Sequence, residues 1–153
     1  MPNFAEIASK KVEDVEQPPL PPVGTYRFRV TKLPEVTKSQ DEAWEFLRVP
    51  CKVIEAQDNV DLSDYKGDPQ NIMMSVSFVF NTQDEAAFET TEFRMRQFFE
   101  KHVGCVEKDA TIAQMLNASV NGEFLGDVKW KQDKRDASGE TMQAEISRTA
   151  PVE

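Results

Sequence analysis

Residues 24–33 read Gly-Thr-Tyr-Arg-Phe-Arg-Val-Thr-Lys-Leu, with apolar and polar side chains in alternation. Successive side chains of a β-strand point to opposite faces, so Tyr26 and Phe28 share one face while Arg27 and Arg29 share the other. This alternation is typical of a strand with one face in the core and one in solvent. The stretch therefore predicts a β-strand with a basic outer face.

Four further strands are expected along the chain. Residues 43–54 predict a second strand, in which Pro50 indicates an edge position or a bulge. Residues 72–80 alternate around an apolar face and predict a third strand. Residues 120–132 and 141–148 predict a closing hairpin with a polar turn.

The segments between these strands predict helices and connections. Residues 34–42 are polar and are expected to form a connection. Apolar residues recur at helical spacing over residues 84–103, which predicts a long amphipathic helix. A short helix is expected after it, because Thr111 and Gln114 have the spacing of a capping box.

The order of elements indicates the fold class. An arm is followed by three strands, a long helix, a short helix and two strands, and a helix between the third and fourth strands is the order of an OB-fold barrel. We therefore predict an α+β fold that is mostly β: a five-stranded OB-like barrel or sandwich with a long helix after the third strand. Residues 1–23 are expected to form an extended N-terminal arm, and residues 24–153 a β-rich domain.

The predicted arm combines a short helix with a stiff spacer. Phe4 and Ile7 lie at helical spacing behind a potential cap at Asn3. The proline cluster that follows is extended and cannot continue a helix; its members are Pro18, Pro19, Pro21 and Pro22. We expect Phe4 and Ile7 to dock on this domain or on a neighbouring copy, which favours a homo-oligomer. A tail without fixed structure is the alternative.

Composition narrows the function classes. The 153 residues carry a net charge of −9, which argues against a general polyanion binder but leaves room for a local basic face. No apolar run approaches the roughly 20 residues of a membrane span. Residues 1–11 do not resemble a secretory signal, so we expect a cytoplasmic protein. Cys51 and Cys105 lie in apolar stretches and are expected to be buried thiols, with a disulfide as the alternative.

The residue types needed for catalysis are scarce. The single histidine, His102, falls at the end of the long predicted helix, where a positive charge complements the helix dipole. One histidine and two isolated cysteines do not make a zinc site or a catalytic triad. No glycine-rich phosphate loop is present. We therefore expect a protein that is not an enzyme and that uses no cofactor or metal.

Basic and aromatic residues on the predicted strands suggest a nucleic-acid-binding face. Single-stranded DNA is held by cations that follow its backbone and by aromatic rings on which its bases stack. The candidate residues are Arg27, Arg29, Trp44, Arg48, Lys52, Lys129, Trp130 and Lys131. The alternative is that the aromatic residues belong to the core and the basic ones to ordinary solvated strand faces.

The stretch 23–30, Val-Gly-Thr-Tyr-Arg-Phe-Arg-Val, resembles a tailed-phage family of small single-stranded-DNA-binding-like proteins of unassigned function. Residues 93–102 resemble the middle helix of that family, and residues 116–151 its closing hairpin. The opening residues 4–8 and the proline spacer resemble arms of related phage proteins. The chain departs from such DNA-binding proteins at its end, Arg-Thr-Ala-Pro-Val-Glu, which lacks an acidic tail.

Two functions follow from these observations. The resemblance implies an OB-like phage accessory protein that binds single-stranded DNA through a β-barrel face. The alternative is a virion structural protein, such as a capsid decoration or head-completion subunit, that assembles through its arm. The expected partners are single-stranded DNA or other phage proteins, capsid or self, and not a membrane. The expected location is the host cytoplasm during infection, or the virion.

Overall fold

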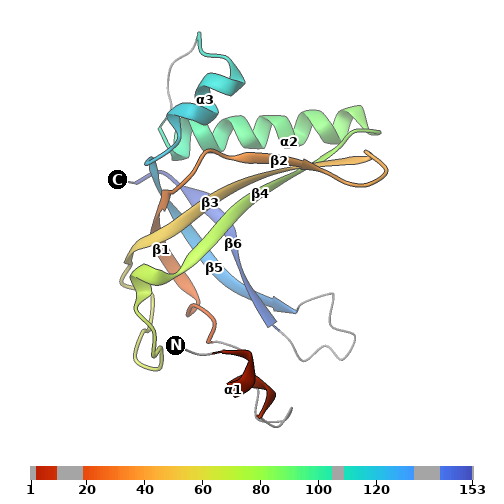
Figure 1. The fold of residues 1–153 in the computed structure, drawn as a ribbon. Helices are drawn as coiled ribbons and strands as arrows, with labels where there is room; N and C mark the ends of the chain where they lie inside the picture. The colour runs from red at the N-terminus through yellow and green to blue at the C-terminus, as the bar shows by residue number, and fades with distance from the viewer. Residues whose placement is uncertain (1–2, 10–18, 105–108, 133–141, 153) are drawn as a thin grey trace.

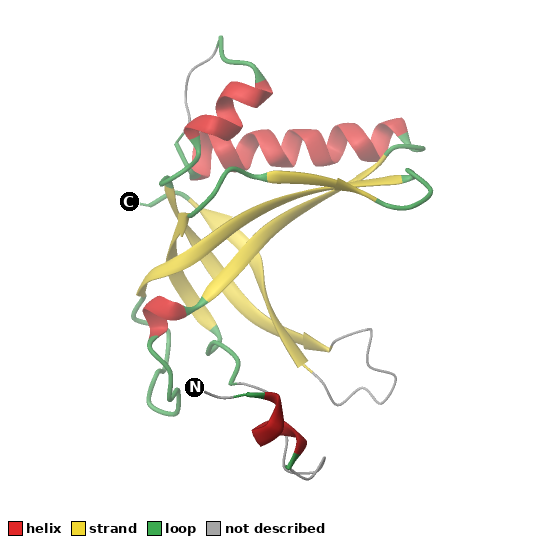
Figure 2. Cartoon of the chain, in the orientation of Figure 1, coloured by secondary structure: helices red, strands yellow, loops and turns green. Residues whose placement is uncertain are grey.

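The computed structural model describes residues 3–9, 19–104, 109–132 and 142–152. The fold in this part of the chain is α+β and mostly β, with a twisted antiparallel sheet and helices near both of its ends (Figures 1 and 2). The strands are β1 (Gly24–Val30), β2 (Glu35–Lys38), β3 (Trp44–Ala56), β4 (Met73–Asn81), β5 (Glu123–Gln132) and β6 (Met142–Ala150). The helices are α1 (Phe4–Ala8), η2 (Pro69–Asn71), α2 (Glu85–Gln97), η3 (Phe98–His102) and α3 (Ile112–Ala118).

The centre of the sheet is β3, a strand of 13 residues. One edge of β3 pairs with β4 along most of its length, and the other pairs first with β2 and then with β1. Pro50 lies at the point where the partner changes, and its carbonyl accepts a hydrogen bond from the Thr31 amide at 3.0 Å. Proline has no N–H to donate, and the gap between β2 and β1 is the place where a missing donor costs least. Pro50 therefore lies inside a central strand, neither at an edge nor in a bulge as predicted.

The core lies on the inner face of the sheet and under α2 and η3. Phe28 of β1 stacks on Phe124 of β5 with ring centroids 5.5 Å apart, and Phe98 of η3 meets Phe124 edge-on at 4.9 Å. Gly126 faces the same rings, and a Cβ atom there would lie 2.9 Å from the Phe28 ring. The alternation predicted from residues 24–33 is confirmed, because Tyr26 and Phe28 are fully buried.

The long predicted helix is present but changes geometry near its end. Helix α2 begins after Asp84, whose side chain accepts a hydrogen bond from the Ala87 amide, and passes into the π-helical turn η3. The π turn places the adjacent rings of Phe98 and Phe99 both in the core. Helix α3 has the predicted capping box between Thr111 and Gln114.

The predicted five-stranded barrel or sandwich is corrected in two respects. The described residues form a six-stranded sheet, because residues 35–38 of the supposed connection pair with β3. That sheet is open, since β4 and β6 approach each other without a hydrogen-bonded ladder in the described part of the chain. The hairpin turn at residues 133–140 lies outside the described residues.

Candidate nucleic-acid interface

The outer face of β3 carries a row of aromatic and basic side chains. Alternate residues of β3 from Leu47 to Val53 are buried, so the residues between them face outward. These outward residues are Trp44, Phe46, Arg48, Pro50 and Lys52, which we call the β3 strip. Trp44 is 41% exposed, and Arg48 is exposed. The structure thus brings three predicted site residues together on one face of one strand.

Small residues of β4 lie beside the strip and leave it accessible. In the antiparallel register, Ser77 is opposite Arg48 and Ser75 is opposite Pro50. Directly opposite residues of paired strands share a face of the sheet. The two serines therefore place small polar side chains beside Arg48 on the same face of the sheet. Over the described residues, neither Arg48 nor Lys52 forms an ion pair.

Arg27 and Arg29 continue the basic surface onto β1, but both bind a carboxylate of β5. Arg29 donates to Glu123 Oε2 at 3.1 Å, and Arg27 donates to Oε1 of the same side chain. The hydrogen bond from Arg29, together with that from Arg27, lowers the pKa of Glu123, so the carboxylate stays charged. We call these three residues the Glu123 cluster. Arg29 is opposite Lys52, so the cluster adjoins the β3 strip.

The predicted residues of β5 lie on a strand that does not pair with β3. Lys131 forms an ion pair with Glu145 of β6 at 2.6 Å, and Lys129 is opposite the same glutamate. Trp130 lies between the two lysines in the sequence and therefore points to the other face of the strand. Its indole Nε1 donates to the carbonyl of Pro21 at 2.6 Å, although the ring stays 47% exposed. Trp130 thus anchors the proline spacer at the end of the sheet.

The arm residues are placed at this same end. Pro22 accepts a hydrogen bond from the Tyr26 hydroxyl at 2.6 Å, next to the bond between Pro21 and Trp130. Pro19 is exposed, and Pro18 lies outside the described residues. In α1, Phe4 is 78% and Ile7 is 53% exposed, and the helix has no buried residue.

A groove separates β4 from β6 and borders the strip. It has a volume of about 780 Å³, with Arg48, Ser75 and Ser77 on one wall and Lys131 and Glu145 on the other. The groove follows the unpaired edges of β4 and β6 and is wide enough to hold groups larger than a water molecule. Lys131 of β5 thus lines a cavity in common with the strip.

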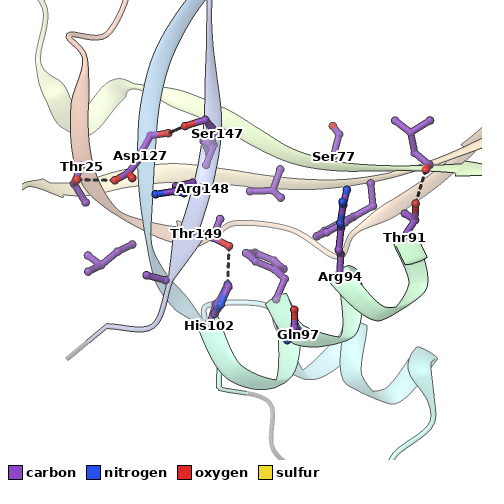
Figure 3. A pocket seen from close by; sticks show the side chains of 17 residues that line it. Thr25, Ser77, Thr91, Arg94, Gln97, His102, Asp127, Ser147, Arg148 and Thr149 are labelled. Carbon is purple, nitrogen blue, oxygen red and sulfur yellow. Dashed lines mark hydrogen bonds between the residues drawn. The ribbon is translucent and has the colours of Figure 1, made fainter. Parts of the chain in front are cut away.

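The line along which β4 and β6 face each other without pairing in the described residues is called the seam. A second pocket lies farther along this seam, between α2 and β6 (Figure 3). Its volume is about 850 Å³, and Arg94 of α2 and Arg148 of β6 line it. Polar contacts hold its walls together: His102 Nδ1 lies 2.6 Å from Thr149 Oγ1, and Thr25 donates to Asp127 at 2.7 Å. In Figure 3 the Arg94 and Arg148 side chains point in different directions, so they do not converge on one anion.

His102 does not have the role expected of it. Burial, with a smaller contribution from Lys101, lowers the pKa of His102 below its ordinary value. A histidine that favours its neutral form does not complement the helix dipole with a charge. Its contact with Thr149 instead joins the end of the long helix to β6.

The described residues also include one cysteine, Cys51, which is buried. Burial raises the pKa of the Cys51 thiol to about 12, which leaves it protonated and unreactive. Cys51 is buried and free, as expected, whereas Cys105 falls outside the described residues. Within the described ranges, no group of three or more His, Cys, Asp or Glu side chains is arranged to hold a metal ion. No helix in those ranges has the length and apolar character needed to cross a membrane.

Comparison of the chain with protein-family models and with curated proteins finds no match.

Some residues of the interface were not anticipated from the sequence. Phe46 shares the outer face with Trp44, and the alternation of β3 carried the signal for it. Glu123 gave no such signal, because 94 and 96 residues separate it from its two arginines. Arg94 of α2 and Arg148 of β6 are far apart in the sequence. Only the folded chain brings both of them to the pocket between α2 and β6.

Proposed function

We propose that this protein binds single-stranded DNA on the β3 strip, as an accessory protein of a tailed phage. We also propose that the sheet is an OB-like barrel that is left open between β4 and β6. A helix follows β4, and β1 pairs with both β3 and β5, which is the pairing expected of an OB-like order. OB-folds bind oligonucleotides on the face of their second and third strands, which correspond here to β3 and β4.

The observation that carries the proposal is the composition of the β3 strip. Trp44 and Phe46 offer ring faces for stacked bases, and Arg48 and Lys52 follow on the same side with no ion pair in the described residues. Consecutive outward residues of a strand lie about 6.6 Å apart, so two aromatic groups at one end of the strip and two basic groups toward the other end are spaced on the scale of single nucleotides. The net charge of −9 predicts modest affinity, and each phosphate contact adds about 0.7 to the slope of log K against log salt.

A salt-titrated binding assay tests this function. A fluorescently labelled oligothymidylate is titrated with the full chain, and anisotropy gives Kd at several salt concentrations. We expect binding at low salt that weakens linearly in a plot of log K against log salt. Absence of binding at low salt, or binding independent of salt, would contradict the proposal.

A second candidate function is favoured by one separate observation. Helix α1 exposes Phe4 and Ile7 and buries nothing against its own domain, which is the state expected of an assembly arm before it meets a partner. The corresponding role is a virion structural protein, a capsid decoration or head-completion subunit. Mass spectrometry of purified particles tests it, and the protein's absence from them would remove this candidate.

A further inference from the structure

An apolar groove lies at the end of the molecule that carries α2 and α3. Val36 of β2, Phe88 of α2, and Ile112 and Leu116 of α3 are among the residues that line it. Its volume is about 230 Å³, and a cavity of roughly 150 Å³ is large enough to hold a benzene ring. Val36 is 58% exposed at its mouth, so the groove is open to a side chain from outside.

Helix α1 carries side chains of the kind this groove accepts. Phe4 and Ile7 are three residues apart and therefore lie on one face of the helix. Both are more than half exposed, so they contact no core of their own chain. An aromatic ring and a branched aliphatic group at this spacing form one apolar surface, of the kind by which a helix binds in a hydrophobic groove.

The arm and the groove lie at opposite ends of the molecule. Figure 1 shows α1 beyond the lower end of the sheet and α2, α3 and β2 at the upper end. The carbonyls of Pro21 and Pro22 accept hydrogen bonds from Trp130 and Tyr26. These bonds hold the C-terminal end of the arm at the lower end of the sheet. The 13 residues of β3 connect the two ends and span roughly 40 Å.

This separation favours docking between copies. Residues 9–20 connect α1 to the anchored prolines and reach roughly 40–43 Å only when fully extended. Docking within one molecule would therefore need a nearly straight chain along the whole sheet, whereas a neighbouring copy needs no such extension. One set of charges is also complementary, because Glu92 lines the groove without an ion pair in the described residues and Lys10 and Lys11 follow Ser9 after the end of α1.

We propose that α1 of one copy inserts Phe4 and Ile7 into the α2–α3 groove of a second copy. The two surfaces are different, so the contact is head-to-tail, and its repetition gives a closed ring or an open chain of subunits. The inference rests on the assembly role proposed for the arm, but not on DNA binding or on presence in virions. It shares no residue with the β3 strip.

Sedimentation velocity of the full-length protein, without DNA and up to millimolar concentration, tests the proposal. Wild-type protein is expected to form dimers and larger species as its concentration rises. An arm variant, Phe4→Ser with Ile7→Ser, and a groove variant, Val36→Asp, should each stay monomeric. All three substituted residues are exposed in the wild-type protein. Ile112→Asp is a second groove variant, to be used if Val36→Asp does not fold. Leu33→Asp, at an exposed position outside the groove, is the matched control and should associate like the wild type.

Mixing the two variants gives the decisive result. The groove variant retains a working arm and the arm variant a working groove, so an equimolar mixture should form heterodimers and no larger species. Wild-type protein that stays monomeric at every concentration would overturn the proposal. An arm variant that associates like the wild type, or a mixture that stays monomeric, would also overturn it.

Discussion

The β3 strip and the Glu123 cluster contain similar basic residues in different electrostatic surroundings. Arg48 and Lys52 form no ion pair in the described residues, although Glu35 of β2 is directly opposite Arg48, whereas Arg27 and Arg29 share Glu123. A cation already neutralised by a carboxylate gains less from a phosphate, because the carboxylate must first be displaced. The difference teaches that an ion pair formed across strands, and not just an acidic residue on the neighbouring strand, decides which cations of a basic face are free to bind.

The largest expected effect comes from removing the aromatic end of the strip. A stacked base contributes about 1–3 kcal/mol, so Trp44→Ala should raise the Kd for single-stranded DNA by about 5–150-fold. Trp130→Phe is the matched control, because Trp130 is similarly exposed but lies at the proline anchor. Anisotropy at one fixed salt concentration measures both. An equal loss in the two variants would show that the strip is not the stacking surface.

The next effect separates the free cations from the paired ones. Each lost phosphate contact lowers the slope of log K against log salt by about 0.7 for a single strand. Arg48→Gln with Lys52→Gln should therefore lower the slope by about 1.4. Arg27→Gln with Arg29→Gln should lower it by less than half as much. Equal decreases would mean that Glu123 does not restrain its two arginines.

Removing the restraining carboxylate should have a smaller effect of opposite sign. Glu123→Gln leaves Arg27 and Arg29 without their ion pairs and should strengthen DNA binding several-fold at low salt. The same titration should show a steeper salt dependence than the wild type. Weaker binding in Glu123→Gln would show that the carboxylate positions the arginines for DNA.

The smallest effect tests the contact between His102 and Thr149 at the end of the long helix. The pKa of His102 is lowered in the folded state, from an ordinary value of about 6.5. As pH falls below 6.5, the unfolded chain binds a proton more readily than the folded one, so the folded state loses stability. His102→Gln should flatten the dependence of urea midpoints on pH between 6.5 and 5. An unchanged profile would show that His102 does not cause it.

The sequence predicted the parts of the fold that depend on local patterns, namely the alternation of side chains in strands and the capping of helices. The alternation in residues 24–33 and 72–80 gave the inner faces of β1 and β4, and Thr111 gave the start of α3. Trp44, Arg48 and Lys52 were predicted to lie on one strand, and the structure places them on one face of it. These features depend on neighbours in the sequence, where side-chain periodicity is visible.

The parts that the sequence missed depend on distant partners. All four residues of β2 are exposed, so no apolar pattern marked it, and only its hydrogen bonds to β3 make it a strand. Pro50 was read as an edge residue because the change of partner from β2 to β1 has no local signature. Glu123 was missed for the same reason, since its ion pairs form across two strands.

The most direct test of the β3 strip uses the two tryptophans of the chain. Their indole N–H groups give two signals in a ¹⁵N-correlated NMR spectrum, and Trp130→Phe assigns them. When oligothymidylate is added to the full chain at low salt, the Trp44 signal should shift and the Trp130 signal should stay in place. A shift of Trp130 with Trp44 unchanged, or no shift of either signal, would contradict the account.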